Sequence, residues 1–297
     1  MKARTVLGDI EQSELGVTYC HEHLILDSPV LASEFPAMHL PSVDEAVTEL
    51  ERCSTVRTMV DAMPEGGRQV DRLVEVSRRT GINIISSTGL HTKKYYPGHP
   101  WALTDSSDHL AVRFEADLAD RCGVIKFAVG PEGLDSRTRE VLEAVAMTQT
   151  RTGAPILSHC EDGLLGMEQI EAMRELGIDL ARVVLSHTDK VADRGYHRAM
   201  LESGANLEYD QALRHHDDPD HPTGPLLAEM AAAGYSGQLM LGTDGARRTL
   251  WKTLGGKPGL AYLGEDYQLI LERHGIDQSL RYQIMVENPA RWLSFLS

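Results

Sequence analysis

The pair His21 and His23, in the segment TYCHEH, has the spacing of two ligands to one metal ion. The pair ends a β-branched run, and successive side chains of a strand point to opposite faces, so positions 21 and 23 share a face. Two imidazoles on one face can bind one divalent cation. Glu22, between them, should point the other way and have a structural role. Because packed or surface histidines often show the same spacing, the pair needs support from elsewhere in the chain.

Three further ligand-type residues stand at the ends of later strand-like runs. His159 follows PILS, His187 follows VVLS and Asp244 follows LMLGT. The carboxyl ends of parallel strands in a barrel meet at one rim, so these side chains would arrive where His21 and His23 arrive. Each histidine taken singly is better explained as a structural residue. Their common position predicts a metal centre.

Lys126 lies inside the otherwise apolar run VIKFAV. A buried ammonium is costly unless it is compensated. Desolvation lowers the pKa of a lysine, and the neutral amine can take up CO2 to become an anionic carbamate that bridges two cations. The alternative is a lysine that snorkels outward or pairs with a core carboxylate.

Eight short β-branched runs, bounded by Gly, Asp or Pro, alternate with longer segments of helical apolar spacing. This repeat predicts an α/β protein whose parallel sheet closes into a (β/α)8 TIM barrel, since closure removes both sheet edges. An open, doubly wound sheet is the alternative. Helices are expected at 136–153 and at 167–177, the second ended by Gly177. The eight runs are residues 16–23, 55–62, 82–89, 123–130, 154–161, 181–188, 205–211 and 237–244.

Four long segments, 24–54, 90–122, 211–236 and 245–281, follow the first, third, seventh and eighth runs. Barrels build their sites from such loops. The C-terminal segment is expected to form one or two closing helices broken at Pro289. We therefore expect a single barrel domain over residues 1–297.

Composition narrows the class of protein and of partner. Of 297 residues, 42% are hydrophobic and 25% charged, as in an ordinary globular protein. The formal charge of -15 disfavours nucleic acid and anionic membranes, whose phosphates would be repelled. Four cysteines without CxxC spacing argue against a disulfide framework or a zinc ribbon. Without a signal-like or membrane-length apolar run, we expect cytoplasmic residence, and a homodimer would be unsurprising.

Together these residues resemble the phosphotriesterase-like family of the amidohydrolase superfamily, and most closely its lactonase members. The resemblance spans nearly the whole chain. It rests on GVTYCHEHL near the N-terminus, on TMVDAMPEGGRQVDRLVEVSRRTGINIISSTGLH, on Lys126, on His159 and His187, and on the LGTD that ends in Asp244.

The resemblance implies a binuclear site in which every ligand has a role. It assigns a buried divalent ion to His21, His23 and Asp244, a more exposed one to His159 and His187, and a bridge between them to carboxylated Lys126 and a hydroxide. Asp244 would accept the proton of the hydroxide and pass it to the leaving oxygen. Zinc is the expected metal, while manganese, cobalt or iron suit such ligands almost equally well.

Cationic and aromatic residues near the expected rim indicate where a substrate would bind. A local basic rim on an acidic protein suits a small anion. The alternative is that the cations lie on loop surfaces with acidic neighbours and that the tyrosines pack the loop. The candidate substrate-binding residues are Lys93, Lys94, Tyr95, Tyr96, Arg247 and Arg248.

The function implied is a metal-dependent hydrolase of ester bonds, namely a lactonase in which hydroxide attacks the carbonyl of a small lactone, such as a sugar lactone with or without a phosphate. A phosphotriesterase acting on organophosphate esters is an alternative that would need a large apolar pocket. A catalytically silent, metal-containing binding protein is another, although bound metal already activates water.

One stretch, YDQALRHHDDPDHPTGP, departs from the lactonase members that act on phosphorylated sugar lactones. The substrate therefore stays open. The histidines His215, His216 and His221 in this stretch could form a third metal site, but a solvent-exposed loop explains them better.

Overall fold

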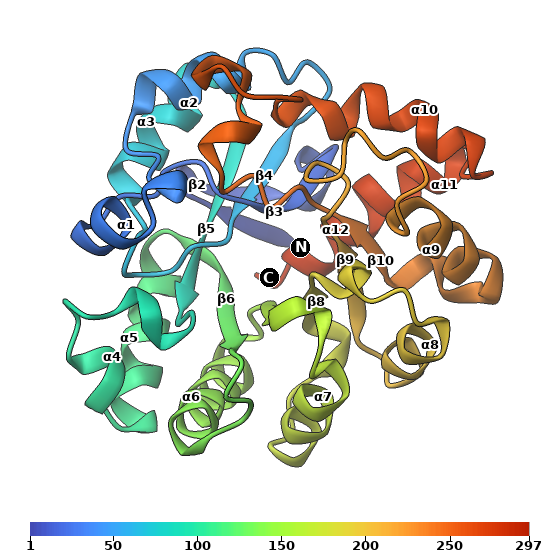
Figure 1. Cartoon of the computed structure of the whole chain (residues 1–297). Coiled ribbons are helices and arrows are strands. Elements are labelled where there is room, and N and C mark those ends of the chain that lie inside the picture. Colours follow the sequence, from blue (N-terminus) through green and yellow to red (C-terminus); the bar gives the residue numbers. More distant parts are fainter. Residues whose placement is uncertain (297) are drawn as a thin grey trace.

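Eight parallel strands form a barrel surrounded by helices (Figure 1). The structure, a computed structural model, describes residues 1–296; Ser297, the last residue of the expected domain, lies outside the described residues. Each strand pairs with the next along the chain and overlaps one of the eight expected runs. The strands are β3 (Thr18–Glu22), β4 (Thr58–Asp61), β5 (Asn83–Gly89), β6 (Cys122–Val129), β7 (Ile156–Cys160), β8 (Val183–Ser186), β9 (Asn206–Tyr209) and β10 (Leu239–Leu241).

The first and last barrel strands meet through the backbone of residues near the predicted ligands. Just past β10, the backbone N–H groups of Thr243 and Asp244 both donate to the carbonyl oxygen of His21, each at 3.1 Å. The N–H of Gly242 donates to the carbonyl of Tyr209 at 3.1 Å and keeps the same segment on β9. These bonds bring the two sheet edges together. The expected TIM barrel is confirmed, and the open doubly wound sheet is wrong.

The α-helices include those expected from apolar spacing. α6 and α7 cover the segments expected to be helical, and Gly177 follows α7 with a φ of 74°. The N–H groups of Gly177 and Ile178 donate to the carbonyls of Arg174 and Met173 at 3.0 Å, which is the hydrogen-bond pattern of a glycine C-cap. The α-helices are α1 (Pro29–Glu34), α2 (Val43–Leu50), α3 (Val70–Thr80), α4 (Trp101–Thr104), α5 (Ser107–Asp120), α6 (Ser136–Thr152), α7 (Gly166–Glu175), α8 (Arg194–Glu202), α9 (Thr223–Met230), α10 (Asp266–Arg273), α11 (Gln278–Tyr282) and α12 (Asn288–Leu293).

Apolar side chains plug the amino-terminal half of the barrel interior. A buried cluster there joins strand residues such as Val124, Leu157 and Met240 to Leu15 and Trp292. The predicted metal ligands are not part of this plug. All four cysteines are buried and unpaired, as expected.

The two chain termini close the floor of the barrel. A hairpin of β1 (Lys2–Thr5) and β2 (Gly8–Glu11), which is not among the expected elements, bonds to the chain end through the carbonyl of Lys2. The expected closing helices are α11 and α12, but the expected break at Pro289 is wrong. The helical backbone continues from α11 through a π-helical segment, Gln283–Glu287, into α12, where Pro289 stands in the first turn and its missing N–H is tolerated.

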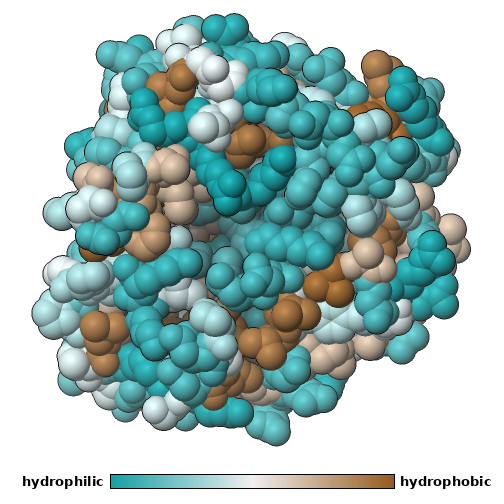
Figure 2. All heavy atoms as spheres, in the orientation of Figure 1, coloured by the Kyte–Doolittle hydropathy of each residue, from teal (hydrophilic) through white to brown (hydrophobic). Residues whose placement is uncertain are grey.

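The face above the strand ends is mostly hydrophilic and is hollowed near its centre (Figure 2). Segments that follow the strands surround this hollow. Within residues 1–296, no helix combines the length and the apolar character needed to cross a bilayer.

Candidate metal centre

His21, His23 and Asp244 form one group of ligand atoms at the strand ends. The ring centroids of the two histidines are 5.3 Å apart. Both turn Nε2 toward Asp244: its Oδ1 lies 3.4 Å from Nε2 of His23 and 4.0 Å from Nε2 of His21. One donor atom from each residue lies within 4.8 Å of the others, which is close enough to hold one cation. The pairing of β3 with β4 is irregular between Tyr19 and Glu22, and such bulges re-aim side chains next to sites.

His159 and His187 form a second pair beside the first. Nε2 of His187 lies 2.8 Å from Nδ1 of His159, and the ring of His187 is 4.9 Å from that of His21. His187 and Asp244 have left-handed backbones, with φ of 64° and 44°. Non-glycine residues adopt this conformation at a cost, and such strain clusters at functional sites.

Lys126 is fully buried in β6, and its Nζ has no hydrogen-bond partner among the described residues. Burial lowers its pKa to about 8, opposed by the charges of Glu208, Asp244 and Asp210. Burial also lowers the pKa of His21, His159 and His187, and the charge of Lys126 adds to this effect at all three. Lys126 therefore belongs to the same cluster and does not snorkel outward.

These residues fit a pair of divalent cations. Imidazole nitrogens and carboxylate oxygens suit zinc, manganese, cobalt or iron. The cluster also holds polar atoms without partners, namely Nζ of Lys126 and Nδ1 of His23, which are costly to bury in that state. Ligand-type side chains around orphaned polar atoms are what a metal centre requires.

Three carboxylates stand behind the histidines. Oε2 of Glu161 is 2.7 Å from Nε2 of His159, and Oε2 of Glu208 is 3.2 Å from Nδ1 of His21. Oδ2 of Asp210 lies 2.7 Å from Nδ1 of His187 and accepts a hydrogen bond from its backbone N–H at 3.1 Å. Carboxylates in this position orient metal-binding histidines.

A cavity of about 140 Å³ opens directly above the cluster. It corresponds to the hollow in the space-filling view (Figure 2). Apart from the predicted metal ligands, its walls carry four cations, several aromatic rings and two methionines. These lining residues are Met38, Met63, His91, Lys94, Tyr95, Glu161, Lys190, Arg214 and Arg247.

Known proteins share both this sequence and this architecture. A profile described as the phosphotriesterase family matches residues 1–293. The chain belongs to the phosphotriesterase family. The phospho-furanose lactonase of Mycoplasmopsis synoviae is 28% identical over 325 residues, which span 99% of this chain and 92% of that protein. A phosphotriesterase homology protein of Mycobacterium tuberculosis is also 28% identical, over 97% of this chain and 96% of its own length.

Solved structures of the family give the same result. The lactonase Lmo2620 from Listeria monocytogenes superimposes with a TM-score of 0.94, covers all of both chains and is 25% identical. An amidohydrolase from Mycoplasma synoviae superimposes with a TM-score of 0.88, is 27% identical, and is matched over 100% of this chain and 92% of its own. The expected resemblance to this family and to its lactonase members is confirmed.

The barrel brings together only half of the residues expected to bind the substrate of this family member. Lys94, Tyr95 and Arg247 line the cavity. A short 3-10 turn, Lys93–Tyr95, follows β5, and it turns neighbouring side chains in different directions.

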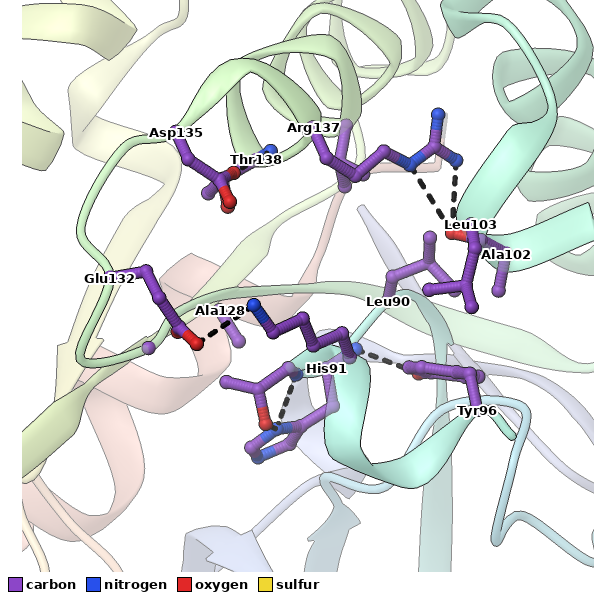
Figure 3. Close-up of a pocket in the computed structure, with 14 residues that line it drawn as sticks. Leu90, His91, Tyr96, Ala102, Leu103, Ala128, Glu132, Asp135, Arg137 and Thr138 are labelled. Carbon is purple, nitrogen blue, oxygen red and sulfur yellow. Dashed lines mark hydrogen bonds and ion pairs between the residues drawn. The ribbon is translucent and has the colours of Figure 1, made fainter. Parts of the chain in front are cut away.

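The other three lie outside the cavity. Nζ of Lys93 pairs with Glu132 at 2.8 Å, beside a smaller neighbouring pocket (Figure 3). The hydroxyl of Tyr96 accepts a hydrogen bond from the N–H of His91 at 2.7 Å and is buried. Nη1 of Arg248 donates to the carbonyl of His39 at 3.1 Å.

Arg214 is a cavity residue that the sequence did not point to. Its guanidinium contacts the carboxylate of Asp244 and also donates to the backbone carbonyl of that residue at 3.0 Å. Burial alone would raise the pKa of Asp244, but the charge of Arg214 and a contact from His23 lower it overall. Arg214 lies in an irregular segment after β9, where no periodic pattern marks a residue as facing the barrel.

His91 is a second unexpected cavity residue, at the end of β5. Its ring centroid lies 4.7 Å from that of His159. Nδ1 of His91 accepts a hydrogen bond from the N–H of Thr92 at 2.7 Å, an arrangement visible below the pocket in Figure 3. In the neutral ring the proton is then on Nε2, which makes this nitrogen a donor. Burial lowers the pKa of His91 well below its usual range, so the neutral form prevails.

Two minor expectations are also decided by the contacts. Glu22 is fully buried, and its carboxylate accepts a hydrogen bond from the hydroxyl of Thr243, which ties β3 to the segment after β10. Within residues 1–296, the groups able to hold an ion do not include the histidines at 215, 216 and 221. The rings of His215 and His221 instead stack on each other, with centroids 3.9 Å apart.

We expect protein loaded with zinc to retain two ions per chain and the Lys126→Ala variant to retain fewer. The charge of Lys126 acts on histidines of both groups, so this residue is the one placed to join two ions. Metal content by mass spectrometry after desalting is the measurement, with Lys190→Ala, a cavity lysine outside the ligand set, as the matched control. Equal metal content in wild type and Lys126→Ala would contradict the bridging role.

Proposed function

We propose that this chain is a metal-dependent hydrolase that opens a small lactone carrying an anionic group, such as a phosphorylated sugar lactone. One observation carries the proposal: five of the six predicted ligands line a cavity whose walls are rich in cations, and the sixth, Lys126, is buried close enough for its charge to act on them. The names of two relatives, phospho-furanose lactonases of Mycoplasmopsis synoviae and Mycoplasmopsis agalactiae, support the same reaction.

The ligand set divides the work of holding two ions. His21, His23 and Asp244 would hold one ion, His159 and His187 the other, and Lys126 as a carbamate would bridge them. When bound, a pair of divalent cations acidifies water and polarises a carbonyl oxygen.

The protein groups around the ligands supply positioning and proton transfer. Asp244 would take a proton from the attacking water at one carboxylate oxygen while Arg214 holds the carboxylate in place. Nε2 of His91 would donate a hydrogen bond to a substrate oxygen, because its tautomer is fixed by the Thr92 N–H.

The cations of the cavity favour an anionic substrate. Lys94, Lys190, Arg214 and Arg247 all line it, and among residues 1–296 only Arg214 of these four forms an ion pair, with Asp244. The charge of Arg214, followed by burial, lowers the pKa of Arg247, so two guanidinium groups repel each other across the cavity. A phosphate or carboxylate on the substrate would relieve this repulsion. The same charge disfavours a neutral organophosphate ester, for which a mostly apolar pocket is expected.

The location, native metal, oligomeric state and partners of the protein are proposed as the sequence predicts them. Four unpaired, buried cysteines and an acidic composition support residence in the cytoplasm. Zinc as the native metal and a homodimer stay predictions, and nucleic acid and membranes are not expected as partners.

We expect the metal-loaded protein to open phosphorylated sugar lactones faster than unphosphorylated ones and to leave organophosphate triesters intact. Proton release in a weakly buffered pH indicator assay measures each reaction, and Lys126→Ala is the inactive control. Failure to open any lactone at full metal occupancy would refute the proposal in favour of a silent binding protein. Turnover of triesters alone would favour a phosphotriesterase.

Arg247→Ala should raise KM for a phosphorylated lactone by about tenfold or more, since a hydrogen bond to a charged group contributes about 1.5–3 kcal/mol. KM for the unphosphorylated lactone should not change. Arg273→Ala, which removes an exposed arginine of α10, is the matched control. The assignment of Arg247 to the anionic group of the substrate is wrong if KM rises equally for both lactones.

His91→Phe should lower kcat by about 100-fold, the usual loss when a donor to a developing negative charge is removed. Phenylalanine keeps a flat aromatic ring at this position, and His91 is not a predicted metal ligand, so metal content should match wild type. His91→Gln, which can still accept from Thr92 and donate into the cavity, should recover part of the rate. A normal kcat in the Phe variant would exclude His91 from the reaction.

A further inference from the structure

β9 supplies none of the six predicted ligands, yet it sends a carboxylate to the centre. Glu208 lies in the middle of this strand and is fully buried. Its Oε2 is 3.2 Å from Nδ1 of His21, while its Oε1 has no hydrogen-bond partner among the described residues. A buried carboxylate with one free oxygen is expensive, so a purely structural role would be better served by an apolar side chain.

The segment that follows the neighbouring strand, β10, leaves room for this carboxylate. A Cβ at Gly242 would overlap Oε1 of Glu208, and it would lie 2.8 Å from the backbone nitrogen of His21 and 2.9 Å from its Cβ. The backbone of Gly242 is not left-handed, so conformation does not require glycine here. Glycine is required here because Glu208 and His21 occupy the space that a Cβ would fill. Glycine at position 242 thus makes room for the contact between Glu208 and the predicted metal ligand His21.

The contact also fixes which nitrogen of His21 is available. If Nδ1–H donates to Glu208, the lone pair is on Nε2, and Nε2 is the atom that faces Asp244. Outer carboxylates act in this way on metal-binding histidines, and their loss weakens metal binding by about 10- to 100-fold.

We propose that Glu208 is a positioning residue that orients His21 and fixes its tautomer for the ion shared with His23 and Asp244. This inference rests on the proposed metal-dependent function. It concerns one ion of the pair, because the histidines of the other ion have carboxylates of their own. Asp210 also approaches Nδ1 of His21, but at 3.6 Å and while engaged by the backbone N–H of His187.

The test compares three variants that disturb the contact differently. Glu208→Leu removes the acceptor but keeps much of the volume, and Glu208→Gln keeps an acceptor for Nδ1–H without the charge. Gly242→Ala leaves both side chains in the chain but places a methyl group where Oε1 lies. Zinc-loaded proteins are mixed with excess EDTA, samples are desalted at intervals, and the zinc that stays bound is counted per chain.

In Glu208→Leu and Gly242→Ala, one of the two zinc ions should be lost about 10- to 100-fold faster than in wild type, while the other keeps its rate. Glu208→Gln should stay close to wild type. Glu161→Leu is the matched control, since it should accelerate loss of the ion held by His159. Circular dichroism of the metal-free proteins identifies a variant that fails to fold, in which case the remaining variants decide.

The proposal would be overturned if Glu208→Leu lost zinc at the wild-type rate. It would also be overturned if Glu208→Gln lost zinc as fast as Glu208→Leu, because the loss of charge alone would then explain the effect. A wild-type protein that binds no zinc would instead overturn the proposed function. Metal release is measured without a substrate, so the two failures are distinguishable.

Discussion

The whole site depends on how the barrel closes. Two backbone N–H groups just past β10 donate to the carbonyl of His21, and this contact joins the first strand of the barrel to the last. It places Asp244 against His21 and His23, which lie near the other end of the chain. In an open sheet these residues would stand on opposite edges. The same closure explains why the ligands needed no common sequence motif, since position at a strand end is enough.

Burial disfavours the charged forms of the titratable groups at the centre. It lowers the pKa of His21 and His187 and raises those of Glu208 and Asp210, so each group is pushed toward its neutral form. Divalent cations would keep the imidazoles neutral but would restore the charge of the carboxylates, because metal ions favour neutral imidazole ligands together with ionised carboxylates. The cluster therefore needs positive charge that the chain itself does not supply. This need explains why the carboxylates of Glu208 and Asp210 are buried there.

The barrel and the ligands could be predicted from the sequence because both follow a repeating pattern. Strand ends are visible as β-branched runs, and His159, His187 and Asp244 stand at the same place in three of them. Glu208 was not predictable, since the two acidic residues in the run ANLEYDQ, Glu208 and Asp210, give no sign of which side faces the axis. Arg214 was missed because irregular backbone follows β9. Lys93 and Lys94 are adjacent in sequence, and only the turn after β5 decides that the second faces the cavity.

The four cations of the cavity walls repel one another, and this repulsion links the binding of the substrate to the binding of the metal. Lys94, Lys190, Arg214 and Arg247 each come from the segment after a different strand, so four loops bring like charges above a site fit for two cations. The guanidinium of Arg214 is held by Asp244, the carboxylate that a metal ion would also use. When an ion takes one oxygen of Asp244, part of the partner of Arg214 is lost, and the guanidinium becomes a stronger attractor for an anion. Binding of the metal and of an anionic substrate would then favour each other through this one arginine, and the affinity for one should rise with the occupancy of the other.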